Sequence, residues 1–343
     1  MDTILFLAHT EEDGTLGKPA LEALGAAVEL NQALKGTLVA ALYGATAQPA
    51  ADAIANCGAS RFLAVAGEDF ASARYATDAA ACEALLRAAQ ATIVITAATS
   101  RSSRVMAGVT RRVGGCVDTH VTAIAAGSGS VTVTRWFYRQ RIEASLTRTQ
   151  RPWVLLLDPG AHSPWQGASG SVTPELIAVP VTESMRRTTV RGMITPPADQ
   201  QTIRPDAKLL FVAGAGWTKK QKDGQTHVPE AETLIVDFLH KSKASLGSSK
   251  SLVELTGENQ SALRFMSHLN QVGQTGATPR HPKGLSTCCH GEEPHTVGWR
   301  FIGERRAINL DPNCGWARGK ADVLYVADAF EVMGKVNALL LPS

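Results

Sequence analysis

Short apolar runs alternate with helical patterns along the first 112 residues, and this alternation constrains the fold more than any other feature of the chain. Runs such as Thr3–Ala8 are typical of buried strands, and Pro19 begins a pattern of apolar residues spaced three and four apart. Strands and helices that alternate at this spacing form a parallel sheet through right-handed crossovers. We predict strands at Thr3–Ala8, Thr37–Tyr43, Arg61–Ala66 and Thr92–Thr96, and helices at Pro19–Leu34, Ala47–Ala55, Asp78–Ala89 and Ser100–Arg112.

The pattern then changes to β-rich runs with short polar joins. They lie at Val117–Ile124, Val131–Tyr138, Ile142–Thr147 and Trp153–Leu157, and a Gly-Ser-rich turn separates the first two. We predict that these runs are antiparallel strands added to the parallel sheet.

A chain of 343 residues exceeds the size at which one core stops growing, about 250 residues, so we expect two domains. We predict an N-terminal α/β domain at 1–160 and a Pro-, Gly- and Ser-rich linker at 161–205 with one strand, Leu176–Val181. A disordered loop is the alternative for the linker. A C-terminal α/β domain is predicted at 206–343, with strands at Lys208–Ala213, Ala307–Leu310 and Val323–Val326 and helices at Pro229–Lys241 and Ala329–Leu341.

Composition excludes several classes of protein. Lysine and arginine number 34 against 31 aspartates and glutamates, so the basic excess of a nucleic-acid binder is missing. No run approaches the ~18 apolar residues of a membrane span, and the first residues lack the basic segment of a signal peptide. Six scattered cysteines form no CxxC pair, which argues against a disulfide framework. We therefore expect a cytoplasmic protein that is not embedded in a membrane.

Two glycine-containing segments could approach a ligand. Gly214-Ala-Gly216 follows a predicted strand and could hold a phosphate, although a tight turn explains it equally well. Gln271–Gly276 combines two glycines with an amide and a hydroxyl, which suits a planar or anionic ligand better than a core. A plain polar turn is the alternative.

A third cluster combines histidines and cysteines: His281, Cys288, Cys289, His290 and His295. Contact with a polar ligand is favoured over a metal site, because adjacent cysteines rarely share one ion well. Histidines at the surface or in the packed interior are the alternative. No hydrolase motif is present, and we interpret the short basic pairs, Lys219-Lys220 among them, as solvated surface.

These segments together resemble the α subunit of electron transfer flavoproteins. That family carries, in order, Gly-x-Ser-Arg, Gln-Val-Gly-Gln-Thr-Gly, Ser-Gly-Ala-Ile-Gln-His, Ala-Ile-Asn-Lys-Asp and Val-Ala-Asp motifs. The counterparts in this chain are Gly247–Lys250, Gln271–Gly276, His290–His295, Ala307–Asp311 and Val326–Asp328. Weaker N-terminal counterparts are Thr96–Thr99 and Leu157–Gly160, so the resemblance covers nearly the whole chain.

The resemblance implies a Rossmann-like C-terminal domain that binds FAD and an N-terminal domain that packs against a β-type subunit. It places Ser249 and Lys250 beside the flavin ring, where Lys250 would raise the flavin potential. The complete implied FAD-binding set is Ser249, Lys250, Val272, Gly273, Gln274, Thr275, Gly276, His290, Gly291, Glu292, Glu293, Pro294, His295, Asn309, Asp328 and Ala329. Asn309 and Asp328 would hold the AMP portion, and no catalytic or metal-binding residue is implied.

The chain departs from the family motifs at several positions. Gly216 and Lys250 stand where the family has arginines, His290 replaces a serine and Pro294 replaces a glutamine. The resemblance implies an electron carrier rather than a substrate-transforming enzyme. Electrons would pass from a flavoprotein dehydrogenase to a quinone reductase or similar acceptor, and the β-type partner would hold AMP or a second flavin. Two alternatives remain: a nucleotide-binding scaffold or sensor without redox chemistry, and a bifurcating flavoprotein that oxidises NADH.

Overall fold

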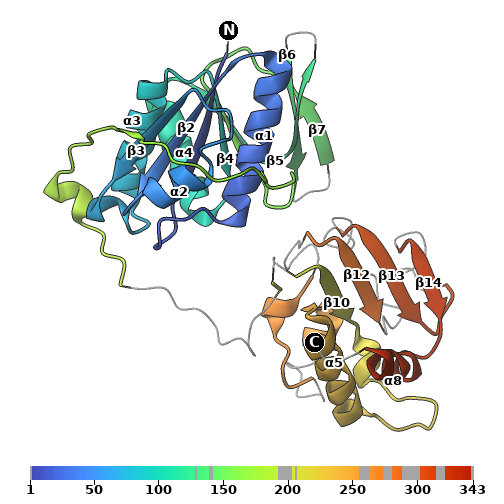
Figure 1. Ribbon diagram of the computed structural model, residues 1–343. Helices are drawn as coiled ribbons and strands as arrows, with labels where there is room; N and C mark the ends of the chain where they lie inside the picture. The colour runs from blue at the N-terminus through green and yellow to red at the C-terminus, as the bar shows by residue number, and fades with distance from the viewer. Residues whose placement is uncertain are drawn as a thin grey trace. The chain divides into compact units, whose positions relative to one another are not determined.

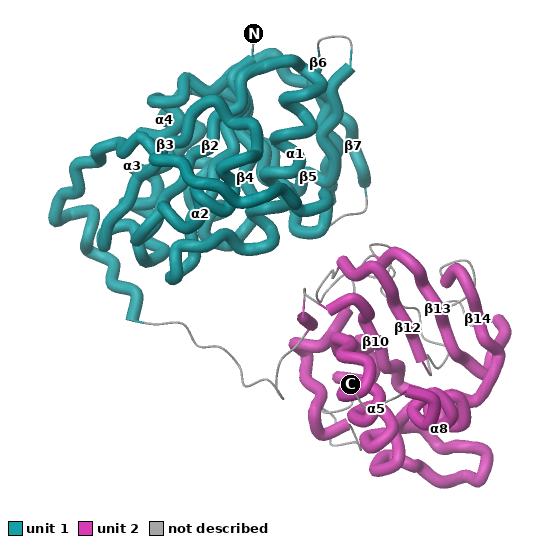
Figure 2. The backbone as a smooth tube through the Cα atoms, in the orientation of Figure 1, with its two compact units in different colours: residues 1–193 teal, residues 194–343 magenta. Residues whose placement is uncertain are grey.

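A computed structural model describes residues 2–127, 130–138, 142–191, 203–204, 207–254, 263–272, 280–287, 302–313 and 321–340. The chain divides into two compact units, unit 1 (residues 1–193) and unit 2 (residues 194–343), which Figure 2 shows in different colours. Each unit holds its own sheet, so the predicted α/β class is confirmed. No helix among the described residues is long and apolar enough to cross a membrane.

Where the structure describes unit 1, it forms nine strands, four α-helices and two short 3₁₀ helices. Figure 1 labels α1 to α4 and several of the strands. The strands are β1 (Thr3–His9), β2 (Thr37–Gly44), β3 (Arg61–Ala66), β4 (Ile93–Ala97), β5 (Cys116–Gly127), β6 (Ser130–Phe137), β7 (Ile142–Leu146), β8 (Trp153–Leu157) and β9 (Glu175–Leu176). The helices are α1 (Lys18–Leu34), α2 (Gln48–Ala53), η1 (Glu68–Phe70), α3 (Tyr75–Ala89), α4 (Ser100–Arg112) and η2 (Glu183–Arg186).

The sheet of unit 1 runs in the order β7-β6-β5-β8-β4-β1-β2-β3-β9. Alternate residues of β1 face opposite layers: Ile4 and Phe6 pack in the cluster that includes α1 and α2, and Leu5 and Leu7 pack in the cluster that includes α3 and α4. A strand covered on both faces is apolar throughout, which explains the continuous apolar run that identified β1 in the sequence.

The predicted antiparallel extension is partly wrong. β5 pairs with β8 in parallel, and β8 lies between β5 and β4 with every residue buried, so both strands belong to the parallel sheet. Only β6 and β7 are antiparallel. The sequence could not distinguish these cases, because a fully buried parallel strand and a short antiparallel strand are both short apolar runs.

Residues 161–191 run along unit 1 and are tied to it by hydrogen bonds. The amide of Trp165 donates to the carbonyl of Leu21 over 2.9 Å, and Arg186 binds Asp69 through two 2.6 Å hydrogen bonds. The predicted strand Leu176–Val181 is instead the two-residue β9, parallel to β3. Residues 161–191 of the predicted linker are therefore packed within unit 1, whereas the amide of Arg204 donates to the hydroxyl of Ser245 in unit 2 over 2.6 Å. The domain boundaries at 160 and 205 stay a prediction.

The described residues of unit 2 form five parallel strands in the order β11-β10-β12-β13-β14. The strands are β10 (Leu209–Ala213), β11 (Ser245–Ser248), β12 (Lys283–Thr287), β13 (Glu304–Asn309) and β14 (Val323–Val326). The helices are η4 (Ala215–Thr218), α5 (Val228–Ser242), α6 (Lys250–Glu254), η6 (His268–Asn270) and α8 (Ala329–Leu339). The chain order changes direction between β10 and β12, and in doubly wound sheets ligands bind at the carboxyl ends of the strands at this switch point.

Candidate functional site

Six of the predicted site residues lie in the described part of the chain, and all six are at the carboxyl edge of the unit 2 sheet. Ser249 follows β11, Asn309 ends β13, and Asp328 follows β14. The other three are Lys250 at the start of α6, Ala329 at the start of α8, and Val272, whose amide donates to the carbonyl of Ser248 over 3.0 Å. Strands that run in parallel thus bring together residues separated by up to 80 positions in the sequence.

Ten predicted site residues lie outside the described residues: Gly273, Gln274, Thr275, Gly276, His290, Gly291, Glu292, Glu293, Pro294 and His295. Their roles stay a prediction. Among the described members of the histidine and cysteine cluster, His281 is buried, and its Nε2 lies 2.8 Å from the carbonyl oxygen of Arg204.

Ser249 links β10 to the start of α6. Its amide donates to the carbonyl of Ala213 over 2.9 Å, and its hydroxyl accepts a hydrogen bond from the amide of Leu252 over 3.3 Å. A serine in this position caps a helix. The next residue, Lys250, has a side chain 41% exposed, and its Nζ lies 3.0 Å from Oε1 of Glu254. A cation is thus present at the strand ends, with a carboxylate beside it.

Asn309 and Asp328 order the turns after β13 and β14. Oδ1 of Asn309 accepts a hydrogen bond from the amide of Asp311 over 3.0 Å. Oδ1 of Asp328 accepts one from the amide of Phe330 over 2.9 Å, which caps α8. Both residues line a pocket of about 300 Å³ that is also lined by Gly216 and by the lysine-rich segment that follows η4. This volume is at the lower end of the range typical for small-ligand pockets, ~300–1,000 Å³.

Trp217 forms part of the site that sequence reasoning missed. The side chain is fully buried, and its indole Nε1 donates to the hydroxyl of Thr287 over 2.8 Å. Its ring lies 4.6 Å from that of Phe330, the second residue of α8. Trp217 therefore connects the end of β12 to the start of α8, and its chain neighbour Gly216 lines the pocket. The only sequence signal was a large aromatic residue directly after a glycine-rich turn.

Two buried hydroxyls near the strand ends have no hydrogen-bond partner among the described residues. They are Oγ of Ser248, the last residue of β11, and Oγ of Ser286, the residue before the end of β12. Buried hydroxyls are normally satisfied, so each could bind a polar group of a ligand or a water molecule. Hydroxyls, an amide and several ammonium groups form a donor set that fits a polar cofactor carrying phosphate.

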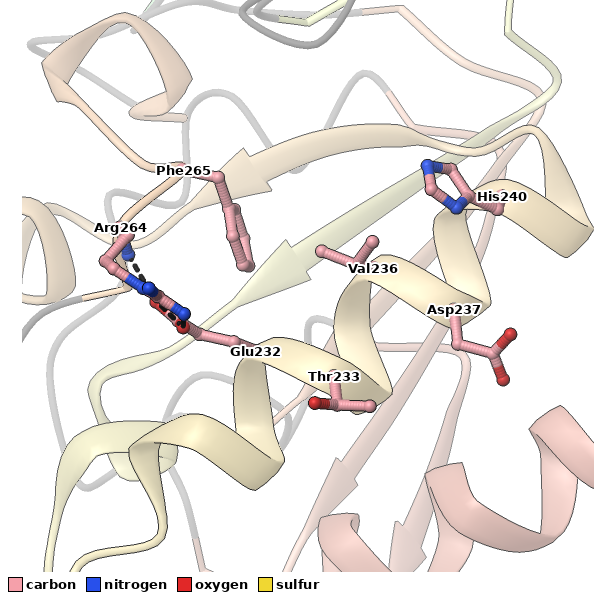
Figure 3. Close-up of a pocket in the computed structure, with 7 residues that line it drawn as sticks. All are labelled: Glu232, Thr233, Val236, Asp237, His240, Arg264 and Phe265. Carbon is pink, nitrogen blue, oxygen red and sulfur yellow. Dashed lines mark hydrogen bonds and ion pairs between the residues drawn. The ribbon is translucent and has the colours of Figure 1, made fainter.

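A larger hollow, of about 720 Å³, lies beside α5 rather than at the strand ends (Figure 3). The buried carboxylate of Glu232 accepts hydrogen bonds there from the amide and the guanidinium of Arg264, at 2.6 to 2.8 Å. These bonds, above all that from the side chain of Arg264, lower the pKa of Glu232. The contact anchors the segment that leads to Val272, and the hollow itself brings together none of the predicted site residues.

A cluster of charged and titratable residues in unit 1 is bound mainly by its own hydrogen bonds and ion pairs. Arg101 binds Asp78 through hydrogen bonds of 2.7 and 3.0 Å and donates to the carbonyl of Phe70 over 2.6 Å. Burial is the main factor that lowers the pKa of nearby His9, and burial raises the pKa of Cys82 to about 12. The polar groups of Arg101 and Asp78 are thus satisfied by hydrogen bonds within unit 1, and we interpret this cluster as one that stabilises the unit.

Two doubly wound sheets, one with polar residues gathered at its strand ends, are the architecture of α/β proteins that bind nucleotides and cofactors. The family model described as "Electron transfer flavoprotein domain" matches residues 4–184, just over half of the chain and all within unit 1. The chain belongs to the electron transfer flavoprotein family, which confirms the resemblance predicted from the sequence. A comparison with curated protein sequences found no significant match.

Proposed function

We propose that the chain is an α-type subunit of an electron transfer flavoprotein and that unit 2 binds FAD at the carboxyl edge of its sheet. The observation that carries the proposal is the meeting of Ser249, Val272, Asn309 and Asp328 at one edge of a doubly wound sheet. These residues come from four separate segments, and their motifs resemble the α subunit rather than the family in general.

The residues of this chain divide into two groups along the site. Ser249, Lys250, residues 272–276 and residues 290–295 would hold the flavin end, and Asn309, Asp328 and Ala329 would hold the adenosine end. Bound FAD supplies a carrier that accepts and releases electrons, while the protein binds it, orients it and limits solvent access. Val272 and Trp217 are buried and would exclude water, and the Lys250 ammonium would place positive charge near the flavin.

The proposed carrier works with three partners. A β-type subunit that holds AMP or a second flavin would complete a heterodimer, with unit 1 as the docking surface. A flavoprotein dehydrogenase would donate electrons, and a quinone reductase or similar acceptor would receive them. The chain would transform no organic substrate itself.

Co-expression with a β-type subunit tests this proposal. We expect a one-to-one complex whose extracted flavin is FAD and whose flavin is reduced by a dehydrogenase and oxidised again by an acceptor. A complex without flavin would contradict the proposal and support the scaffold without redox chemistry. That alternative is motivated by Gly216, which lines the pocket where the family has an arginine. Two redox flavins together with NADH oxidation would support the bifurcating flavoprotein instead.

A further inference from the structure

Three lysines line the 300 Å³ pocket at the strand ends. Lys219, Lys220 and Lys222 follow η4, and the same pocket is lined by Asn309 and Asp328. The segment turns back on itself, since Lys220 pairs with Thr226 in an antiparallel bridge. We call residues 219–226 the basic hairpin.

Local hydrogen bonds hold the basic hairpin in place. The amide of Gly224 donates to the carbonyl of Gln221 over 2.9 Å, and the positive φ of Gly224, 78°, suits glycine at this turn. The side-chain amide of Gln221 donates to the carbonyl oxygens of Gly216 and Lys219, at 3.1 and 2.7 Å. The lysines therefore project from an ordered turn that is tied to η4 at the end of β10.

The pocket carries a surplus of positive charge. Lys222 lies 3.8 Å from Asp328, whereas neither Lys219 nor Lys220 has an ion-pair partner in the described part of the chain. The residues that line the pocket thus include three lysines and one carboxylate, that of Asp328. The N-terminus of α8 adds partial positive charge, because the aligned peptide dipoles make a helix N-terminus electropositive.

We propose that the basic hairpin binds the phosphate groups at the adenosine end of the dinucleotide. Lysine is a compact point charge on a flexible stem and binds phosphate without the fixed geometry of arginine. A surplus of two positive charges matches the charge of a diphosphate. The inference rests on the proposed FAD binding. It assigns a role to Lys222 and to Lys219 and Lys220, a pair that the sequence analysis interpreted as solvated surface.

Binding titrations on the full-length chain, with any subunit that copurifies and with flavin removed, test this assignment. FAD binding is followed by flavin fluorescence at low salt, and ADP is then used as a competitor. The Lys220→Gln/Lys222→Gln variant is expected to bind FAD and ADP about tenfold more weakly, equivalent to ~1.4 kcal/mol. The Lys220→Arg/Lys222→Arg variant keeps the charge and is expected to bind both ligands as the unchanged chain does.

Lys208→Gln is the matched control, since Lys208 is exposed and precedes β10 at the opposite edge of the sheet. The loss in the double variant should also shrink as salt increases, because the lysines are solvent-accessible. Equal FAD affinity in the double variant and the unchanged chain would overturn the assignment. Competition by inorganic phosphate as effective as that by ADP would overturn it in favour of a free phosphate site. Failure of the unchanged chain to bind FAD would instead contradict the proposed function.

Discussion

Gly247 leaves the space that the side chain of Val272 occupies. A Cβ atom placed on Gly247 would lie 2.7 Å from Cγ2 of Val272 and 3.3 Å from Cδ1 of Leu210. Carbon atoms cannot pack at the first of these distances, and the branched valine is stiff at χ1. The absence of a side chain in β11 therefore lets the segment that begins the Gln271–Gly276 motif pack directly on the sheet.

Gly247→Ala is expected to destabilise unit 2 by about 1–3 kcal/mol, the usual effect of overpacking a core. It should also weaken FAD binding, because Val272 must move. Gly334→Ala is the matched control, since Gly334 lies within α8 with no atom within 4 Å of an added Cβ. Alanine there should stabilise the helix by ~0.5–1 kcal/mol. Chemical denaturation measures the free energy of unfolding of both variants. Equal changes in that free energy for the two substitutions would contradict the role of Gly247.

Lys250→Ala is expected to lower the potential at which bound FAD accepts its first electron. A charge-assisted hydrogen bond contributes ~1.5–3 kcal/mol, or roughly 60–130 mV for one electron. We expect the potential to fall by about 60 mV, the lower end of this range, because Lys250 is partly exposed and paired with Glu254. Glu254→Gln should raise the potential, since it removes the competing charge. Redox titration measures both shifts, and an unchanged potential in Lys250→Ala with FAD bound would exclude this role for the lysine.

Asp118 fixes the added strands to the parallel sheet of unit 1. Its fully buried carboxylate accepts hydrogen bonds from Arg135 over 2.7 Å, from the indole of Trp153 over 2.8 Å, and from Arg148. Burial alone would raise the pKa of Asp118, but the hydrogen bonds from Arg148, Trp153 and Arg135 outweigh it and lower the pKa.

Asp118→Asn is expected to destabilise unit 1 by about 3 kcal/mol at pH 7, because it leaves two arginines without their charge partner. A lowered pKa means that the carboxylate stabilises the folded state at pH values above the unfolded pKa of ~3.9 and loses that effect as the pH falls through the folded value. The difference in free energy of unfolding between the unchanged chain and Asp118→Asn should therefore be constant from pH 7 to 5 and shrink below about pH 4. Glu143→Gln, an exposed carboxylate on β7, is the control, and a gap that persists in acid would contradict this account.

The sequence predicted best those strands whose residues are nearly all apolar. The strand ranges Arg61–Ala66, Trp153–Leu157 and Val323–Val326 and the helix Ser100–Arg112 match the structure residue for residue. β11 and β12 were missed, because Ser245–Ser248 and Lys283–Thr287 each contain a single large apolar residue.

The candidate site could be predicted where residues follow a strand within a recognisable motif, as Asn309 and Asp328 do. The basic hairpin could not be predicted, because no periodic pattern distinguishes lysines on a pocket wall from lysines in solvent. Trp217 was missed for a related reason. Its burial depends on Thr287, 70 positions along the chain, and on Phe330, and both contacts exist only after the sheet has formed.

Titration of the flavin-free full-length chain with FAD, compared with Asn309→Ala, tests most directly whether the strand ends of unit 2 hold the cofactor. Asn56→Ala is the control, since it removes an exposed amide side chain from unit 1. We predict saturation at one FAD per chain, and at least a tenfold loss in Asn309→Ala, or ~1.4 kcal/mol, with no loss in the control. Absence of FAD binding, or equal binding by all three proteins, would contradict the account.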